Sequence, residues 1–337
     1  MNKFIKKASL VLVLVLTFML AAGCGQGQQK NTNSSSSSPS SSNQKKVVIG
    51  FSQVTLQSPF YVALMQAAEN EAKAKGAQLV YVDAQENIQK QNNDVQDLIT
   101  KGINVLLLNP VNPDGVAPAL AAAQKANIPV VTVDRPTTSK VATFVGRDNK
   151  EMGRLAGKKA VELLGGPGHA KGVVVEIQGA AGDRVMMARR DGFHEIVDKE
   201  PGIKVIQSPY CDYTRSKAVK AFQDILQANP KIDLVYAHND DMALGAVQVL
   251  DQNNIKGVKI VGIDGLMEAI VAIKGGKYDA TVLNDPQYLG KLAVDTALGV
   301  LNGEKYPEFI DAGTGLVDKQ NVDQYVDTSL TFASSKK

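Results

Sequence analysis

Residues 47–64 read VVIGFSQVTLQSPFYVAL, an apolar run followed by the features of a helix start. The β-branched and aromatic side chains of the first half favour a strand. Ser58 suits the N-cap position, because its hydroxyl can accept a hydrogen bond from a first-turn N–H, and Pro59 suits the first helical position, where a missing N–H costs nothing. Phe60 and Tyr61 then lie at a strand-to-helix junction, a place that is normally polar.

The same alternation of strand and helix recurs along the chain. The helical stretches 61–75 and 92–101 each end directly before a glycine, which is a common helix stop. Continuous hydrophobic strands separated by helices predict parallel sheets that are covered on both faces. The predicted strands lie at 47–54, 78–84, 104–111, 129–135, 142–146, 172–179, 203–208, 233–239, 259–265 and 279–285.

These elements divide into two similar halves, each about the size of one doubly wound domain. The strand predicted at 279–285 and the helix predicted at 289–301 follow the second half, and they could pack back onto the first domain. We therefore predict an α/β fold of two doubly wound parallel-sheet domains. One lobe is expected to comprise 46–147 plus 285–312, and the other 148–284 plus 313–330.

The N-terminal segment has the features of a secretion signal. Residues 1–23 contain three lysines and then an apolar run too short to span and stop in a membrane. The run ends in LAAGC, residues 20–24, which resembles a lipoprotein lipobox in which Cys24 is lipidated. The alternative is a plain secretory signal with an incidental Cys24. Residues 24–45 are rich in Ser, Gln and Asn, so we expect a flexible tether that holds a folded module at the outer face of the cell membrane.

Charge and cysteine content argue against several classes of protein. Removal of the signal leaves 34 basic residues of the original 37, equal to the 34 acidic residues. A balanced chain without basic runs argues against nucleic-acid binding. Besides Cys24 the chain contains only Cys211, so no disulfide framework is expected.

Polar side chains follow most of the predicted strands. Ligands of open parallel sheets bind beyond the carboxyl ends of the strands. The residues at these ends are Ser52 and Gln53, Asp83, Asn109, Asp134 with Arg135, Gln178, Asn239 with Asp240, Asp264, and Asn284 with Asp285. Such acids, amides and guanidinium groups can satisfy the hydroxyls of a sugar, and the rings of Phe60 and Tyr61 can cover its apolar faces.

Each of these residues also has a purely structural explanation. Asp264 and Asn239 can cap helices, and the two rings can close the core. The Asp134–Arg135 pair favours ligand binding, because capping does not require an acid and an arginine directly after a strand. A small anion or amino acid would call for more unpaired positive charge than this set offers.

Catalytic and metal-binding interpretations find little support. The three histidines, His169, His194 and His238, are widely spaced and lack the neighbours of a metal site. Of these, His238 adjoins a predicted pocket residue, and we expect a packing or rim role for it. No G-x-S-x-G motif occurs, and Cys211 has no evident base partner. We expect neither an enzyme nor a cofactor or metal.

From about Lys46 to Val326 the chain resembles the periplasmic sugar-binding proteins of the ribose-binding type, the solute receptors of ABC importers. The resemblance implies a type I periplasmic-binding-protein fold, in which two lobes joined by hinge strands close around a monosaccharide and present it to a membrane permease. The motifs that carry it are SPFYVAL (58–64), DVQDLITKGINVLLLNP (94–110), IPVVTVDR (128–135), VGRDN (145–149), MMARRDGF (186–193), AHNDDMALGA (237–246) and IVGIDG (260–265).

The resemblance also assigns roles to residues on both lobes. Phe60 and Tyr61 would stack on the sugar from the first lobe, beside Ser58 at the helix start. The hydroxyl-binding residues of that lobe would be Asn109, Asp134 and Arg135. The residues that close from the second lobe and hinge would be Arg189, Tyr213, Asn239, Asp264 and Asn284. Arg189 lies inside a predicted helix and not at a strand end.

Four of these residues depart from the pattern of ribose binders. That pattern has Asn at Ser58, Phe at Tyr61 and Tyr213, and Gln at Asn284. The two extra hydroxyls and the shorter amide leave the ligand open between ribose, another pentose, a hexose and a cyclic polyol such as inositol.

Two other classes share this pattern. Lactose-repressor-type regulators carry an N-terminal helix-turn-helix, whereas this chain begins with a signal-like segment. A receptor that presents its closed form to a chemoreceptor or sensor kinase stays open as an alternative. The expected partners are thus a monosaccharide, the ABC permease subunits and, through Cys24, the membrane; the chain is expected to be a monomer.

Overall fold

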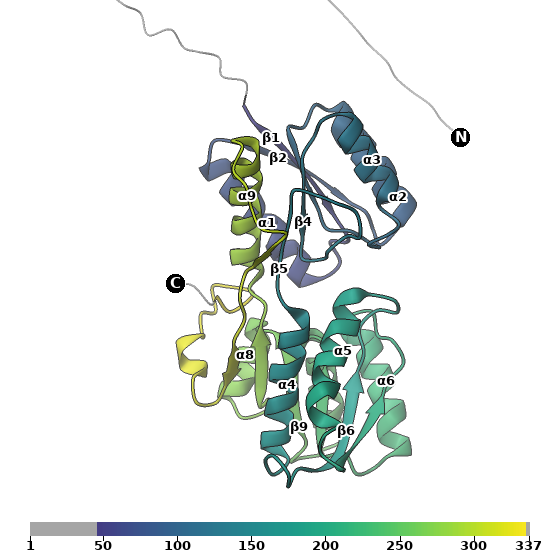
Figure 1. The fold of residues 1–337 in the computed structure, drawn as a ribbon. Coiled ribbons are helices and arrows are strands. Elements are labelled where there is room, and N and C mark those ends of the chain that lie inside the picture. The colour runs from purple at the N-terminus through teal and green to yellow at the C-terminus, as the bar shows by residue number, and fades with distance from the viewer. Residues whose placement is uncertain (1–45, 335–337) are drawn as a thin grey trace, which may run out of the picture. The chain divides into compact units, whose positions relative to one another are not determined.

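The computed structural model describes residues 46–334, which form two six-stranded sheets covered by helices (Figure 1). The predicted signal peptide at 1–23, Cys24 and the tether at 24–45 lie outside the described residues. Within 46–334, none of the helices combines the length and the apolar character that a membrane span requires. The first sheet with its helices is called the first lobe below, and the second sheet with its helices the second lobe.

The first sheet has the strand order β11-β5-β4-β3-β1-β2, and all of its strands are parallel. Its strands are β1 (Val48–Gln53), β2 (Gln78–Asp83), β3 (Val105–Leu108), β4 (Val130–Val133), β5 (Thr143–Gly146) and β11 (Phe309–Asp311). Its helices are α1 (Pro59–Ala74), α2 (Ile88–Thr100), α3 (Ala117–Lys125) and α9 (Pro286–Leu301). Helices α1 and α9 pack together on one face, and α2 and α3 pack together on the other (Figure 1).

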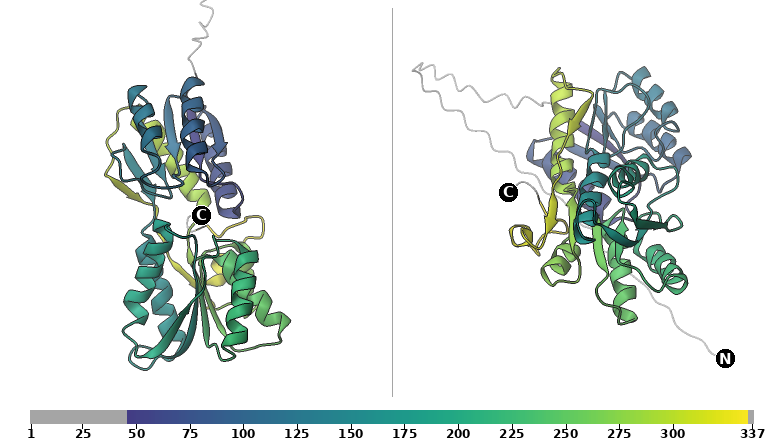
Figure 2. Two further views of the ribbon diagram at one scale, coloured as in Figure 1. Left: turned by 90° about the vertical axis from the view of Figure 1, so that its right-hand side faces the viewer. Right: turned by 60° about the horizontal axis from the view of Figure 1, so that its bottom comes forward.

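The second sheet repeats this architecture in the order β12-β10-β9-β8-β6-β7, with only β12 antiparallel to its neighbour. Its strands are β6 (Lys171–Ile177), β7 (Gly202–Gln207), β8 (Leu234–Ala237), β9 (Lys259–Asp264), β10 (Ala280–Leu283) and β12 (Leu316–Asp318). Its helices are α4 (Asn149–Leu163), α5 (Arg184–Val197), α6 (Arg215–Ala228), α7 (Asp240–Gln252) and α8 (Met267–Lys274), followed by the short 3-10 helix Val322–Gln324. In the left view of Figure 2, helices lie on both sides of this sheet.

Burial on both faces explains why the strands read as continuous apolar runs. In β3, Val105 and Leu107 pack into one hydrophobic cluster, whereas Leu106 and Leu108 pack into the cluster on the opposite face. All four side chains are fully buried. The prediction of parallel sheets covered on both faces is confirmed.

Helix starts were predicted less accurately than strands. Ser58 does occupy the N-cap position of α1 and Pro59 the first turn, but the Ser58 side chain makes no capping hydrogen bond. Helix α2 begins at Ile88, four residues before the predicted start, because the Asn87 side chain caps it by accepting a hydrogen bond from Lys90 N. The first turn of α2 is polar apart from Ile88, so apolar periodicity did not mark its start.

The chain passes between the two sheets three times. The first crossing (147–148) joins β5 to α4, the second (284–285) joins β10 to α9, and the third (312–315) joins β11 to β12. Helix α9 packs against α1, β3, β4 and β5, so its predicted return to the first domain is confirmed. The predicted return of the strand at 279–285 is wrong, because β10 pairs with β9 in the second sheet. The predicted lobe boundaries fall in or beside these crossings. They stay a prediction, because Lys45–Lys337 also form one compact unit.

Candidate ligand-binding site

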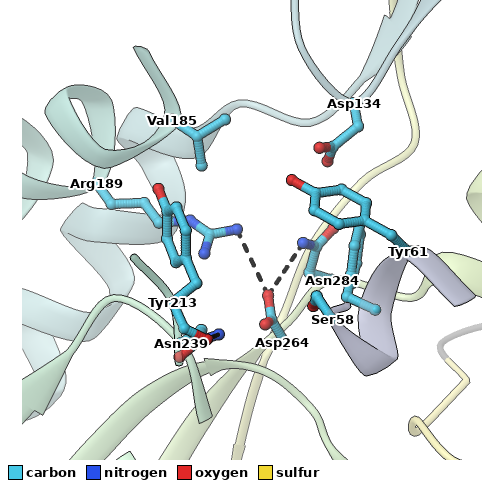
Figure 3. A pocket seen from close by; sticks show the side chains of 10 residues that line it. Ser58, Tyr61, Asp134, Val185, Arg189, Tyr213, Asn239, Asp264 and Asn284 are labelled. Atoms are coloured by element: carbon cyan, nitrogen blue, oxygen red, sulfur yellow. Dashed lines mark hydrogen bonds and ion pairs between the residues drawn. The ribbon is translucent and has the colours of Figure 1, made fainter. Parts of the chain in front are cut away.

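A small cavity lies where the carboxyl ends of the two sheets face each other (Figure 3). Its volume is about 30 Å³, which is room for roughly two or three water molecules. It is lined by Ser58, Phe60, Tyr61, Asp134, Val185, Arg189, Tyr213, Asn239, Asp264 and Asn284. The structure thus brings nine of the eleven sequence-predicted residues together and adds Val185, which lies one turn before Arg189 on α5.

Aromatic side chains from both lobes flank the cavity. Phe60 and Tyr61, on the first turn of α1, have ring centroids 5.4 Å apart in an edge-to-face arrangement. Tyr213 contributes its ring from the second lobe, and Figure 3 shows it across the cavity from Tyr61. The backbone of Tyr213 has a φ of 56°, an unusual value for a bulky residue. The ring packs against Gly179, where any side chain would collide with it.

Arg189 and Asp264 form the charged centre of the second-lobe wall. Arg189 Nη2 lies 3.5 Å from Asp264 Oδ1, and Asn284 Nδ2 donates to the same oxygen at 3.1 Å (Figure 3). Arg189 also donates to the backbone oxygen of His238 and to Asn149 Oδ1. Burial raises the pKa of Asp264 to about 6, although the Arg189 guanidinium opposes this shift.

The backbone at Asp264 adopts a φ of 124°, which L-residues rarely adopt. Asp240 holds this turn, because its Oδ2 accepts hydrogen bonds from Gly265 N and Leu266 N, each at 2.8 Å. Tyr278 and Thr281 donate their hydroxyls to the same carboxylate. Burial raises the pKa of Asp240 to about 7. Asp240 is therefore a buried anchor of the site and not simply a residue of the helix start.

Asp134 and Arg135 follow β4 in the first lobe, as the sequence predicted, but only Asp134 lines the small cavity. Asp134 has a φ of 64°, and burial raises its pKa. The Arg135 guanidinium lies 5.7 Å from the centre of the Tyr61 ring. It borders a wider outer cavity of about 470 Å³, which is also lined by Ser58, Tyr61 and Tyr213.

Asp183 connects the two lobes at this outer cavity. Its Oδ2 accepts a hydrogen bond from the Tyr213 hydroxyl at 2.6 Å and lies 3.4 Å from Arg135 Nη2. Sequence analysis missed Asp183, because it lies five residues beyond the strand-end residue Gln178, at the N-cap of α5. An N-cap aspartate at the start of the MMARRDGF helix was the signal that could have found it.

Asn109 lies behind the cavity and does not line it. Its Nδ2 donates to Gln53 Oε1 at 2.7 Å. Asn109 Oδ1 and Gln53 Nε2 are both buried, and neither finds a hydrogen-bond partner among residues 46–334. The predicted contact between Asn109 and a ligand stays a prediction.

The structural explanations hold for several other strand-end residues. Asn239 caps α7 through Met242 N, while its Nδ2 donates to the backbone oxygen of Tyr213, so it both caps a helix and lines the cavity. Gln178 bonds to the backbone oxygen of Ser208, and Asp83 to Gln85 N. His238 is fully buried and bonds to Glu176, which is the packing role expected for it.

The charges around the cavity suit a neutral, hydroxyl-rich ligand. The carboxyl groups of Asp134, Asp183 and Asp264 face the guanidinium groups of Arg135 and Arg189, so both guanidinium groups already have an acidic partner. Burial raises the pKa of both Tyr61 and Tyr213, which keeps the two hydroxyls neutral; the Tyr213 hydroxyl donates to Asp183, and the Tyr61 hydroxyl can donate to a ligand. Across the described part of the chain, no cluster of His, Cys, Asp and Glu could hold a metal ion.

Comparisons with known proteins agree with this geometry. A family model described as a periplasmic binding protein domain matches residues 49–305. The ribose import binding protein of Bacillus subtilis is 38% identical over 272 residues, which cover 80% of this chain and 87% of that protein. The galactofuranose-binding protein of Escherichia coli is 34% identical over 72% of this chain and 79% of its own length.

A solved structure is more similar still. It is an ABC transporter solute-binding protein from Mycobacterium smegmatis with bound glycerol, and it shares 59% sequence identity with this chain. It superposes with a TM-score of 0.82 and covers 86% of this chain and 100% of its own. These relatives bind solutes for transport and are not enzymes. The chain therefore belongs to the periplasmic binding proteins, with the two-lobed type I fold and a likeness to the ribose-binding type.

Proposed function

We propose that this chain is an extracytoplasmic receptor that captures one small sugar or polyol between its lobes and delivers it to an ABC-type importer. The observation that carries the proposal is the cavity lined from both lobes by two acids, the guanidinium of Arg189, two amides and two tyrosine side chains. These groups both donate and accept hydrogen bonds, and the two tyrosine rings offer flat apolar faces. A ligand that touches both lobes favours their closed arrangement.

The small volume of the cavity bears on how a ligand can be accommodated. A monosaccharide is larger than about 30 Å³, so its binding requires the lobes or the tyrosine rings to separate. The relative from Mycobacterium smegmatis holds glycerol, a three-carbon polyol. Even glycerol exceeds the volume of this cavity, so ribose, another pentose, a hexose and a cyclic polyol such as inositol are all candidates. No contact described above favours the sensor alternative over an importer.

A thermal-shift screen tests the proposal. Glycerol, erythritol, xylitol, ribose, arabinose, galactose and myo-inositol are each added to the purified chain, and a ligand of the native state must raise the melting temperature. Saturation at about 100 times the dissociation constant stabilises the native state by about 2.7 kcal/mol. If none of the seven compounds shifts the melting temperature, the proposed ligand class is wrong.

The location rests on the N-terminal sequence. We propose that Cys24 is lipidated and holds the receptor at the outer face of the membrane, with residues 24–45 as the tether. Membrane fractionation of cells that express the wild-type chain or Cys24→Ser tests this. The wild-type chain should sediment with membranes and the variant should be released; equal release of both would contradict the anchor. Light scattering of the released chain should give the mass of a monomer.

A further inference from the structure

Arg147 contacts all three crossings between the lobes. It belongs to the first crossing, and its side chain is buried. Its Nη1 and Nη2 donate to Asn284 Oδ1 at 2.7 Å and to the backbone oxygen of Asp285 at 2.8 Å, both in the second crossing. Its Nε donates to the backbone oxygen of Gly313, in the third crossing, at 2.7 Å. Because a guanidinium is planar and rigid, these bonds together specify one mutual arrangement of the crossings.

Backbone hydrogen bonds join the same segments. Ala312 N donates to the backbone oxygen of Gly146 at 2.7 Å, which links the third crossing to the end of β5. Leu283 N donates to the backbone oxygen of Gly315 at 2.8 Å, which links the end of β10 to the third crossing. The guanidinium of Arg147 therefore lies at a point where the three crossings run close together.

The same side chain determines how Asn284 faces the cavity. The Asn284 amide has one oxygen and two N–H groups. Arg147 bonds to the oxygen, and one N–H donates to Asp264 Oδ1 at 3.1 Å (Figure 3). The second N–H remains for a ligand, and the oxygen is turned toward Arg147. Asn284 can therefore donate a hydrogen bond to a ligand oxygen in the cavity.

The cost of burying this guanidinium indicates that it does more than fill space. All three of its hydrogen-bond acceptors are uncharged oxygens. Burial lowers the pKa of Arg147 to about 10, with Asp285 and Asp134 opposing the shift, so the side chain is still charged at neutral pH. A well-packed apolar side chain often stabilises an interior as well as a buried charge does. An apolar side chain at this position could neither hold the three crossings in one arrangement nor orient Asn284.

We propose that Arg147 is a positioning residue for ligand binding, which orients Asn284 as a hydrogen-bond donor and ties that orientation to the arrangement of the three crossings. Its contribution to ligand binding rests on the proposed function, whereas its contribution to the crossings does not. Sequence analysis did not single out Arg147, although it lies in the VGRDN motif.

Three variants test the proposal. Arg147→Met removes all donors while keeping most of the side-chain volume, and Arg147→Lys keeps the charge but not the planar fork. Arg154→Met is the matched control, because Arg154 pairs only with Glu151 and Glu195 within the second lobe among the described residues. Calorimetry with glycerol and with ribose measures affinity well below the melting temperature, and hydrogen exchange measures protection of the Leu283 and Ala312 amides.

The expected result has three parts. Arg147→Met lowers the affinity about tenfold, as loss of a charge-assisted hydrogen bond would, and Arg147→Lys recovers part of it. Adding Asn284→Ala to Arg147→Met costs less than Asn284→Ala alone, because the two side chains act as one unit. Exchange at the Leu283 and Ala312 amides becomes faster in Arg147→Met, whereas Arg154→Met behaves as the wild type in every measurement.

Two outcomes would overturn the proposal. A lower melting temperature with wild-type affinity would reduce Arg147 to a residue that supports only the fold. Unchanged exchange at both amides would show that Arg147 does not hold the crossings together. If the wild-type chain binds neither glycerol nor ribose, that result counts against the proposed function, and the exchange measurement alone decides the role of Arg147.

Discussion

At the scale of single residues, the site depends on backbone conformations that most side chains avoid. Asp134 and Asp264, the two acids that line the cavity, have φ values of 64° and 124°. Asn and Asp tolerate positive φ better than most residues, because their short polar side chains can bond locally. A substitution at these positions therefore changes both the chemistry and the backbone, unless the new residue accepts the same φ.

We predict that Asp134→Asn weakens ligand binding about tenfold or more, because a neutral acceptor forms weaker hydrogen bonds than a carboxylate. Asn tolerates the same φ, and the loss of a buried charge should leave the melting temperature unchanged or higher. Asp83→Asn, at another strand end of the first sheet, is the control. Calorimetry and thermal unfolding check both variants; a normal affinity in Asp134→Asn would remove Asp134 from the site.

Replacement of Arg189 should affect the stability of the fold as well as ligand binding. The resemblance places Arg189 at the ligand, so Arg189→Ala should lose binding. The side chain is buried, and it joins Asp264, Asn149 and the backbone of His238. Removing one partner of a buried pair costs about 3–5 kcal/mol, so Arg189→Ala should also lower the stability of the fold.

At the scale of elements, a histidine ties a helix to a strand of the second sheet. His194 on α5 bonds to Glu176 on β6 through Nε2 at 3.1 Å and to Asp198 through Nδ1 at 2.8 Å. The hydrogen bond with Glu176 is the main cause that raises the pKa of His194 from 6.5 to about 9. The native state therefore binds a proton between these pH values that the unfolded chain releases.

We predict that this contribution to stability is fully present below pH 6.5 and is lost as the pH rises through about 9. His194→Gln can still donate to Glu176 but cannot titrate. The difference in urea midpoint between wild type and His194→Gln should therefore shrink as the pH rises over this range. His169→Gln, in the exposed loop before β6, is the control. A constant difference at all pH values would contradict a charged His194.

At the scale of the whole molecule, the lobes touch through side chains that we expected to face a ligand. Arg135 from the first lobe and Tyr213 from the second both contact the carboxylate of Asp183. The wall between the small inner cavity and the wider outer one thus includes an ion pair across the lobes. Such a contact favours the closed arrangement before any ligand binds.

We predict that Asp183→Asn increases the mean separation of the lobes in the ligand-free chain. The single oxygen of Asn can still accept the capping bond from Val185 N, and its Nδ2 can donate to the Tyr213 hydroxyl oxygen in place of the present bond, so the main loss is the charge facing Arg135. Small-angle scattering should give a larger radius of gyration than the wild type, and a saturating ligand should reduce the difference. Asp191→Asn, whose partner Arg190 lies on the same helix, is the control. Identical scattering curves for wild type and Asp183→Asn would show that the ion pair between Asp183 and Arg135 does not hold the lobes together.

Much of the fold and the site follows from local pattern. The ten predicted strands each overlap an observed strand, because burial on both faces leaves a continuous apolar run that local sequence reveals. The short strands β11 and β12 were missed, since three residues carry no apolar run and pair only through the tertiary structure. Asp134, Asn239, Asp264 and Asn284 were predicted because parallel strands place their carboxyl ends at one edge, whereas Arg189 and Tyr213 came from the family resemblance.

The amino-acid sequence alone was enough for the alternation of strand and helix, the two halves, the aromatic pair of α1 and the polar residues at the strand ends. These features depend on residues near one another in the chain. The tertiary structure alone decided that Asp183 pairs with Arg135, that Asn109 lies behind the cavity, and that Arg147 reaches all three crossings. Each of these contacts joins segments distant in sequence, and their geometry exists only once both sheets have formed and the chain has crossed between them.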